Sequence, residues 1–218
     1  MSENLIRTMS GQITVRIREK ILTGVYPPGS ALLQDVIAAE FGVSKIPVRE
    51  ALVQLRAEGL VDVFAHRGFQ VRPLSSTEVD EVFRLRSQIE PLAVAEGARR
   101  AQDEDREGTR LAFNNLNDAL AAGELYESGI LNRTFHTALV VPRLQPIAAE
   151  ILSRLHTLSQ RYVRVHLLPP GRVKRATEEH TGLFEVWMNG DTDEVMRLTR
   201  VHIETTRDDL AQLLQAPE

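Results

Sequence analysis

The stretch that decides the fold of this chain is residues 41–60, which read Phe-Gly-Val-Ser-Lys-Ile-Pro-Val-Arg-Glu-Ala-Leu-Val-Gln-Leu-Arg-Ala-Glu-Gly-Leu. Gly42 can take the positive φ that ends one helix, Ser44 can cap the next, and Pro47 falls in a first turn, where a missing N–H costs nothing. The pattern predicts a turn followed by a helix that starts near Lys45.

This predicted helix has one apolar face and one basic face. The apolar residues recur at the 3.6-residue period, at Val48, Ala51, Leu52 and Leu55, and the neighbouring face carries Lys45, Arg49 and Arg56. In a helix-turn-helix the first residues of the second helix meet base edges in the major groove, so Lys45 and Arg49 stand where DNA would be read. An ordinary amphipathic surface helix with scattered charges explains this segment alone equally well.

The flanking sequence favours the DNA-reading interpretation. Residues 8–22 carry isoleucines at helical spacing, residues 33–41 form a second short helical segment, and Tyr-Pro-Pro-Gly separates the two. After Gly59 the hydrophobic period changes to two on either side of Ala-His-Arg-Gly at 65–68, which predicts a β-hairpin. Three helices and a hairpin make the winged helix-turn-helix plan, whose wing would offer His66, Arg67 and Gly68 to the DNA backbone or minor groove.

Charge and length indicate two domains of different character. Residues 1–74 hold nine Lys/Arg and seven Asp/Glu, a net charge of +2, whereas residues 75–218 hold seventeen and twenty-three, a net charge of −6. Only the first part suits a polyanion. With 218 residues and 43% hydrophobic content we expect two domains, 1–74 and 75–218, with the boundary at Arg-Pro-Leu-Ser-Ser (72–76).

The residue types that are missing also bound the function. The chain has no cysteine, which excludes a disulfide framework and a thiolate metal site. No apolar run approaches the ~20 residues of a membrane span, and the N-terminus lacks a signal-peptide core. We therefore expect a cytoplasmic protein that makes no contact with membranes.

The whole sequence beyond the boundary has helical periodicity. Helices are expected near 76–101, 104–121, 125–140, 144–167, 172–189 and 192–214, and Gly or Pro residues separate them. An antiparallel bundle is the simplest arrangement. The predicted fold class is therefore mainly α: a winged helix-turn-helix followed by an antiparallel all-helical bundle.

Two charged residues lie on the apolar face of the first bundle helix. The 3.6-residue period places Arg86 and Glu90 near the centre of a stripe of valine, phenylalanine and isoleucine. The pair can be satisfied within the helix, four residues apart. Equally, Arg86 can present its guanidinium to the carboxylate of a small effector inside the bundle.

Three histidines give a sharper signal, because His136, His180 and His202 each lie on the apolar stripe of a different helix. Asn132 shares the face of His136 one turn earlier, so an amide oxygen could join three ring nitrogens at one point. A single buried histidine is more often a hydrogen-bonded core residue than a ligand, but the three together favour a divalent metal site. Zinc, nickel or manganese would fit. His156 and His166 show no such pattern and are interpreted as structural.

The N-terminal residues resemble a known family. Ile-Arg-Glu-Lys-Ile-Leu-Thr-Gly-Val-Tyr-Pro-Pro-Gly (17–29), Gly-Val-Ser-Lys-Ile-Pro-Val-Arg-Glu-Ala-Leu (42–52) and Glu-Gly-Leu-Val (58–61) are similar to the signature of GntR-type bacterial transcription regulators. The resemblance implies DNA contacts from Ser44, Lys45, Pro47 and Arg49, together with the wing. Lys45 stands where the family usually has an arginine, and a lysine lacks the planar two-pronged donor.

The C-terminal residues resemble the all-helical domain, called FCD, of the FadR-type branch of the same family. The similar segments are Leu-Asn-Arg-Thr-Phe-His (131–136), Glu-Glu-His (178–180), Asn-Gly-Asp (189–191) and Val-His (201–202). In that domain an Asp or Asn and three His commonly hold a divalent metal beside an effector cavity, and the matching positions are Asn132, His136, His180 and His202. Many members have Asp where this chain has Asn132, and the neutral amide leaves the site one unit more positive. An anionic effector could then bind directly, with Arg86 as a second anchor.

Two classes of function follow. The first is a ligand-responsive DNA-binding regulator, which the resemblance makes a repressor, acting as a homodimer on a DNA operator with two-fold symmetry. The second is a metal-dependent hydrolase, because three His with an open position also describe catalytic zinc. Hydrolysis would need a general base, and Glu179 points about 100° away from His180 along the helix. The basic reading helix is also unexplained by an enzyme, so we rank the regulator first.

Overall fold

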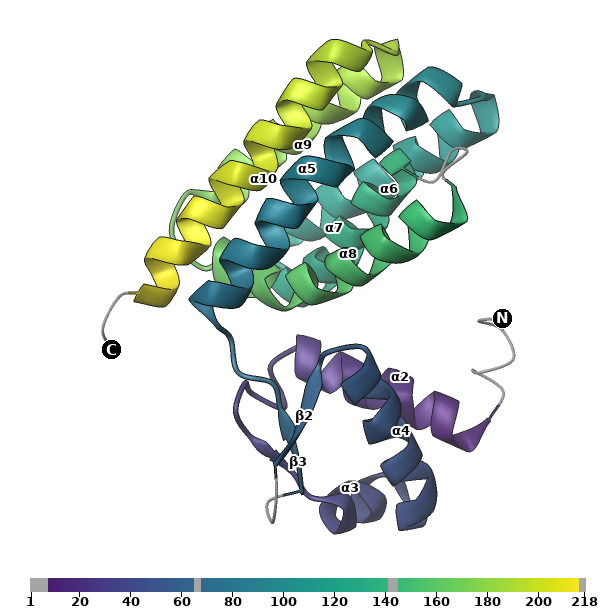
Figure 1. Ribbon diagram of the computed structural model, residues 1–218, viewed down its shortest axis with the longest axis vertical. Helices are drawn as coiled ribbons and strands as arrows, with labels where there is room; N and C mark the ends of the chain where they lie inside the picture. The colour runs from purple at the N-terminus through teal and green to yellow at the C-terminus, as the bar shows by residue number, and fades with distance from the viewer. Residues whose placement is uncertain (1–7, 65–67, 141–144, 216–218) are drawn as a thin grey trace. The chain divides into compact units, whose positions relative to one another are not determined.

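The computed structural model describes residues 8–64, 68–140 and 145–215. Within these residues the chain forms nine helices and one three-stranded sheet (Figure 1), and this confirms the predicted mainly α class. The chain divides into two compact units, Met1–Leu74 and Ser75–Glu218. No described helix combines the length and the hydrophobicity that crossing a membrane requires.

The first unit has the predicted helices and hairpin, and one strand more. Its elements are α2 (Met9–Leu22), β1 (Ala31–Leu32), α3 (Gln34–Phe41), α4 (Lys45–Ala57), β2 (Val61–Phe64) and β3 (Gly68–Val71). The antiparallel sheet has the order β1-β3-β2, with Val61 opposite Val71 and Ala31 opposite Gln70. β1 was not expected, because a strand of two residues is too short to show a period of two. His66 and Arg67 lie outside the described residues.

Local chemistry explains the helix-turn-helix bend, with one exception. Gly42 has φ 66° and ends α3, and the N–H of Val43 donates to the carbonyl of Ala38 across this turn. α4 begins at Lys45, as predicted. Ser44 occupies the N-cap position, but its side chain makes no capping hydrogen bond, so the predicted cap is wrong. The exposed Ser44 hydroxyl therefore has no role in starting the helix.

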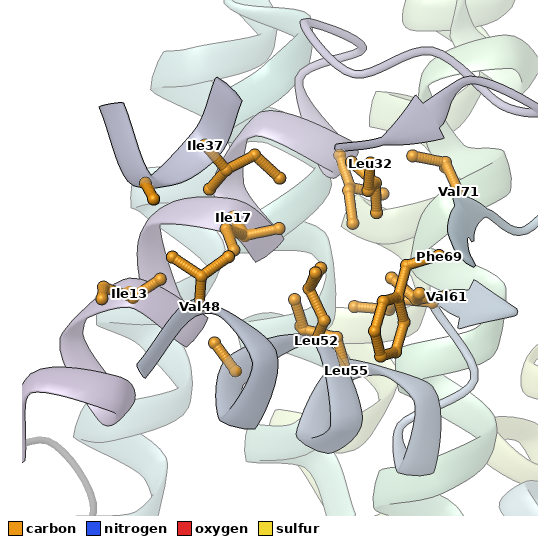
Figure 2. Close-up of a cluster of buried hydrophobic side chains, with 14 residues drawn as sticks. Ile13, Ile17, Leu32, Ile37, Val48, Leu52, Leu55, Val61, Phe69 and Val71 are labelled. Atoms are coloured by element: carbon orange, nitrogen blue, oxygen red, sulfur yellow. The ribbon is translucent and has the colours of Figure 1, made fainter. Parts of the chain in front are cut away.

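The core of the first unit is built from α2, α4 and the sheet. Val48, Leu52 and Leu55 are fully buried and face Ile13 and Ile17 of α2 and Phe69 of β3 (Figure 2), and Ala51 is buried in the same cluster. Val63 is exposed, although the alternation placed it with the buried Val61, because the core does not extend along β2 toward the turn. Burial of one face of α4 leaves the basic face to solvent.

The second unit is an all-helical bundle whose bounds lie within two residues of the predicted ones. Its helices are α5 (Ser76–Arg100), α6 (Asp103–Ala122), α7 (Leu125–Val140), α8 (Pro146–Leu167), α9 (Arg172–Asn189) and α10 (Thr192–Gln215). α5 packs most extensively on α10, beside which it runs in Figure 1, and α6 packs most extensively on α7.

One close approach between helices fixes the packing of the bundle. At Gly97 of α5 a Cβ atom would overlap the backbone carbonyl oxygen of Leu139 in α7. The same carbonyl accepts a hydrogen bond of 3.0 Å from the indole Nε1 of Trp187, which is fully buried in α9. Three helices therefore meet at one backbone atom, and only glycine leaves room for that contact.

Candidate DNA-reading helix and candidate metal centre

The start of α4 carries the residues expected to read DNA. Ser44, Lys45 and Arg49 are exposed, and Pro47 is half-buried in the first turn. Nζ of Lys45 lies 2.5 Å from Oδ1 of Asp35 on α3, whereas no ion pair of Arg49 occurs within the described part of the chain. Arg49 can thus donate to a guanine without losing a partner, and Lys45 must first leave Asp35.

Ile46 is a surface residue that the sequence patterns did not single out. It is 71% exposed in the first turn of α4, beside Lys45. An exposed aliphatic side chain at this point of a reading helix suits contact with a thymine methyl group. Its position off the buried stripe of α4 is the sequence signal that could have found it. Gly68 begins β3 with φ 74°, a backbone conformation that favours glycine.

The bundle brings the three predicted histidines together. One ring nitrogen from each of His136 (α7), His180 (α9) and His202 (α10) lies within 4.8 Å of the other two. His136 and His180 are buried and His202 is half-buried. The distances are suited to one small ion held from three helices.

His180 provides a test of whether a metal fits. Both of its ring nitrogens are buried and neither has a hydrogen-bond partner in the described part of the protein. A neutral imidazole always has one nitrogen that accepts, and leaving it unmatched in the core is costly. Burial lowers the pKa of His180 well below its usual value and that of His136 to about 4. Both rings are therefore neutral at pH 7, the form that binds metal, so the residues fit the ion.

Two carboxylates lie behind the histidines. Oε1 of Glu90 is 3.2 Å from Nδ1 of His136, and Oε2 of Glu179 is 2.7 Å from Nδ1 of His202. When Glu179 accepts from Nδ1–H of His202, it holds the tautomer in which Nε2 is free to bind a metal. Sequence reasoning missed Glu179, because it faces away from its neighbour His180 and toward a histidine on another helix.

Glu90 is a buried anion with several partners. Nε and Nη2 of Arg86 donate to its two oxygens at 2.7 and 3.0 Å, and Nε2 of His156 lies at 3.1 Å. Burial raises the pKa of the Glu90 carboxyl, but the Arg86 guanidinium and the nearby histidines outweigh it and hold the pKa well below its usual range. His156 therefore lies beside the Glu90 carboxylate, outside the group of three histidines.

Arg86 pairs within its helix, as one of the two alternatives expected, and it also lines a cavity. It forms the two-pronged pair with Glu90, and its Nη1 lies 3.2 Å from Oγ of Ser159 on α8. The same side chain lines a cavity together with Asn132 and the three histidines. An arginine has five N–H groups, so two remain for a ligand in this cavity.

The cavity is bounded by polar and apolar side chains together. The space between its lining atoms is about 520 Å³, part of which is open to solvent. His166, which was interpreted as structural, also lines this cavity, and its Nε2 lies 3.2 Å from Oδ2 of Asp209.

Comparisons with known proteins agree with this two-part architecture. The family described as bacterial regulatory proteins, gntR family, matches residues 9–71, and the family described as FCD domain matches residues 81–205. The HTH-type transcriptional repressor GlaR of Escherichia coli is 28% identical over 198 residues, which cover 87% of this chain and 90% of that protein.

Two solved structures share the fold. E. coli McbR/YncC has a TM-score of 0.79 at 22% identity, covering 95% of this chain and 98% of that one. A transcriptional regulator GntR from Rhodococcus sp. RHA1 has a TM-score of 0.80 at 21% identity, covering 96% and 99%.

Proposed function

This chain belongs to the gntR family of bacterial regulatory proteins and carries an FCD domain, and from that premise we propose that it is a repressor controlled by a small carboxylate bound beside a divalent metal. It is a DNA-binding transcriptional regulator. The relatives and families named above are regulators, so the hydrolase alternative has no support and the chain is not an enzyme.

The observation that carries the proposed control is the buried histidine triad in a cavity that also contains Arg86. A divalent ion held by three neutral imidazoles and the neutral amide of Asn132 keeps its full charge of two. A carboxylate could bind this ion through an open position and also accept from the free N–H groups of Arg86. Zinc, nickel or manganese would suit these nitrogen and oxygen donors, and a metal that demands thiolate would not.

On the DNA side, we propose that two copies of the chain bind a two-fold operator as a homodimer. Each copy would place the start of α4 in the major groove, with Lys45 and Arg49 at base edges and Ser44 and Pro47 near the backbone. The wing residues His66, Arg67 and Gly68 would contact the backbone or minor groove. The reading helix supports this assignment, because its apolar face is buried and its basic face is exposed.

A physical connection between cavity and linker supports the proposed control. Arg86 reaches Ser159 on α8, and one turn later on the same helix Tyr162 is fully buried against the start of α5. The Tyr162 hydroxyl accepts from the Ser75 N–H at 3.3 Å and donates to Oε1 of Glu78 at 3.0 Å. Ser75 directly follows the first unit, so a ligand that shifts α8 would act on the segment that joins the two units.

The test is operator binding with and without ligand. Labelled DNA from upstream of the chain's own gene is titrated with protein by fluorescence anisotropy, in zinc and then in chelator, across a panel of small carboxylates. We expect specific binding, and a loss of about 5- to 150-fold with a matching acid only when metal is present. If an acid releases the operator equally well in zinc and in chelator, the metal has no role in control. If the protein binds the upstream DNA no more tightly than a scrambled duplex, that DNA does not contain its operator.

A further inference from the structure

The cavity extends away from the histidine triad toward the C-terminal end of α10. His202, Thr206 and Leu210 line it from successive turns of this helix, about 6 Å apart. A ligand whose carboxylate lies at the triad therefore has its far end near Thr206 and beyond. The residues around that far end determine which carboxylates fit.

Thr206 presents the unsatisfied polar group of this region. Its Oγ1 atom is buried and has no hydrogen-bond partner within the described residues. The other aliphatic hydroxyl on the cavity wall, that of Ser128, donates to the Glu124 carbonyl at 2.8 Å and is satisfied. Helical threonines normally bond back to the carbonyl four residues earlier, as Thr199 does to Val195 at 2.7 Å. The Thr206 hydroxyl is thus left to a group inside the cavity.

The far end carries no free positive charge. The apolar side chains that line the cavity include Phe83, Leu116, Leu120, Leu167, Ile203 and Leu210. His166 also lines this end, but burial lowers its pKa to about 4, so it is neutral at pH 7. Among the described lining residues Arg86 is the one permanent cation, and Glu90 balances its charge.

We propose that the effector is a monocarboxylate with an apolar chain and an uncharged hydroxyl or carbonyl group that bonds to Thr206, and that the site rejects dicarboxylates. This inference rests on the proposed function, which places one carboxylate at the metal and Arg86. A second carboxylate at the far end would lose its water and meet apolar walls and one neutral hydroxyl. A hydroxyl group there gains the partner that Thr206 lacks.

Three probes of equal chain length test the proposal: pentanoate, 5-hydroxypentanoate and pentanedioate. Their affinities for the zinc-loaded full chain are measured by titration calorimetry. We expect 5-hydroxypentanoate to bind about 3- to 10-fold more tightly than pentanoate, the worth of one neutral hydrogen bond. Pentanedioate should bind at least 10-fold more weakly than pentanoate.

Variants at Thr206 attribute the preference to its hydroxyl. Thr206→Val keeps the shape and should abolish the advantage of 5-hydroxypentanoate over pentanoate. Thr206→Ser should keep the advantage. Thr205→Val is the matched control, because the neighbouring Thr205 does not line the cavity, and it should change neither affinity.

The outcomes separate the two proposals. Pentanedioate binding as tightly as pentanoate, or an unchanged hydroxyl preference in Thr206→Val, overturns the inference and leaves the metal-bound carboxylate in place. If none of the three acids binds with zinc present, the proposed carboxylate site fails and the inference fails with it. Thr206→Ser retains the hydroxyl group. If this variant keeps the melting temperature of the parent chain but loses the preference for 5-hydroxypentanoate over pentanoate, the proposal is also contradicted.

Discussion

Removing the proposed metal, or the proposed ligand His180, should reveal how much a metal-bound triad contributes to stability. The three candidate ligands come from α7, α9 and α10, so an ion that binds them would stabilise the folded bundle and not the unfolded chain. At a free metal concentration of 100 times Kd the stabilisation is about 2.7 kcal/mol. For a protein of this size 1 kcal/mol shifts Tm by about 2–4 °C, so chelator should lower the Tm by about 5–10 °C.

His180→Ala should remove this metal-dependent shift. The variant keeps the other two histidines and loses the ring whose two nitrogens have no hydrogen-bond partner among the described residues. The assay is differential scanning fluorimetry with zinc and with chelator, alongside elemental analysis of the purified protein. The control is His156→Gln, which alters a buried histidine that pairs with Glu90 and lies outside the triad. His156→Gln should lower the Tm both in zinc and in chelator, and the difference between these two Tm values should remain.

The reasoning is refuted if purified protein holds less than about 0.2 equivalents of any transition metal, takes none up on titration, and shows the same Tm in zinc and in chelator. The histidines would then be packed core residues. Equal zinc shifts in His180→Ala and in the parent chain would also refute it, because the ion would have to bind elsewhere.

Four further predictions concern DNA, coupling, packing and pH. Arg49→Ala should cost about 1–3 kcal/mol of operator affinity and flatten base preference at one position per half-site, and unchanged preference in a binding-site selection would remove α4 from the major groove. Tyr162→Phe should leave ligand and operator affinities nearly intact but weaken their coupling, seen as a smaller change in operator Kd on adding a carboxylate that binds. Gly97→Ala should lower the free energy of unfolding in urea by about 3 kcal/mol, because the Leu139 carbonyl must move and break its hydrogen bond to Trp187. Gly108→Ala is the control and should not lower it, because a Cβ atom at Gly108 would have no neighbour within contact distance. The metal-free bundle should lose stability as pH falls from about 6.5 toward 4, because the pKa of His136 is lowered to about 4 in the folded state and the unfolded chain therefore takes up the proton first. At pH 4.5 this residue alone should lower the free energy of unfolding by about 2.5 kcal/mol. A urea midpoint that stays constant over this pH range would contradict the prediction.

Periodicity predicted the parts of the fold that depend on a single helix or strand. The stripe of Val48, Leu52 and Leu55 is buried because a helix repeats its core face every 3.6 residues, and the same rule pointed His136 and His180 inward. The long bundle helices were found for this reason. The site residues remain predictions that rest on geometry.

Contacts between helices could not be predicted in this way. The bond between Glu179 and His202 depends on how α9 is rotated and shifted against α10, and no pattern within one helix contains that register. The same holds for Glu90 and His136. The unpartnered hydroxyl of Thr206 depends on the shape of the cavity. The capping role of Ser44 failed for a local reason, since occupancy of the N-cap position does not ensure the side-chain bond.

The ion pair between Lys45 and Asp35 bears on how the protein searches a genome. A lysine that is already neutralised releases fewer counterions when it meets random DNA, so Asp35 should lower the salt slope of non-specific binding by up to about 0.9. Each visit to a wrong sequence is then shorter, while at the operator the bonds to a base edge compensate for leaving Asp35. Because Asp35 holds the lysine of the reading helix, the protein should stay bound to non-specific DNA for a shorter time and test candidate sites more rapidly.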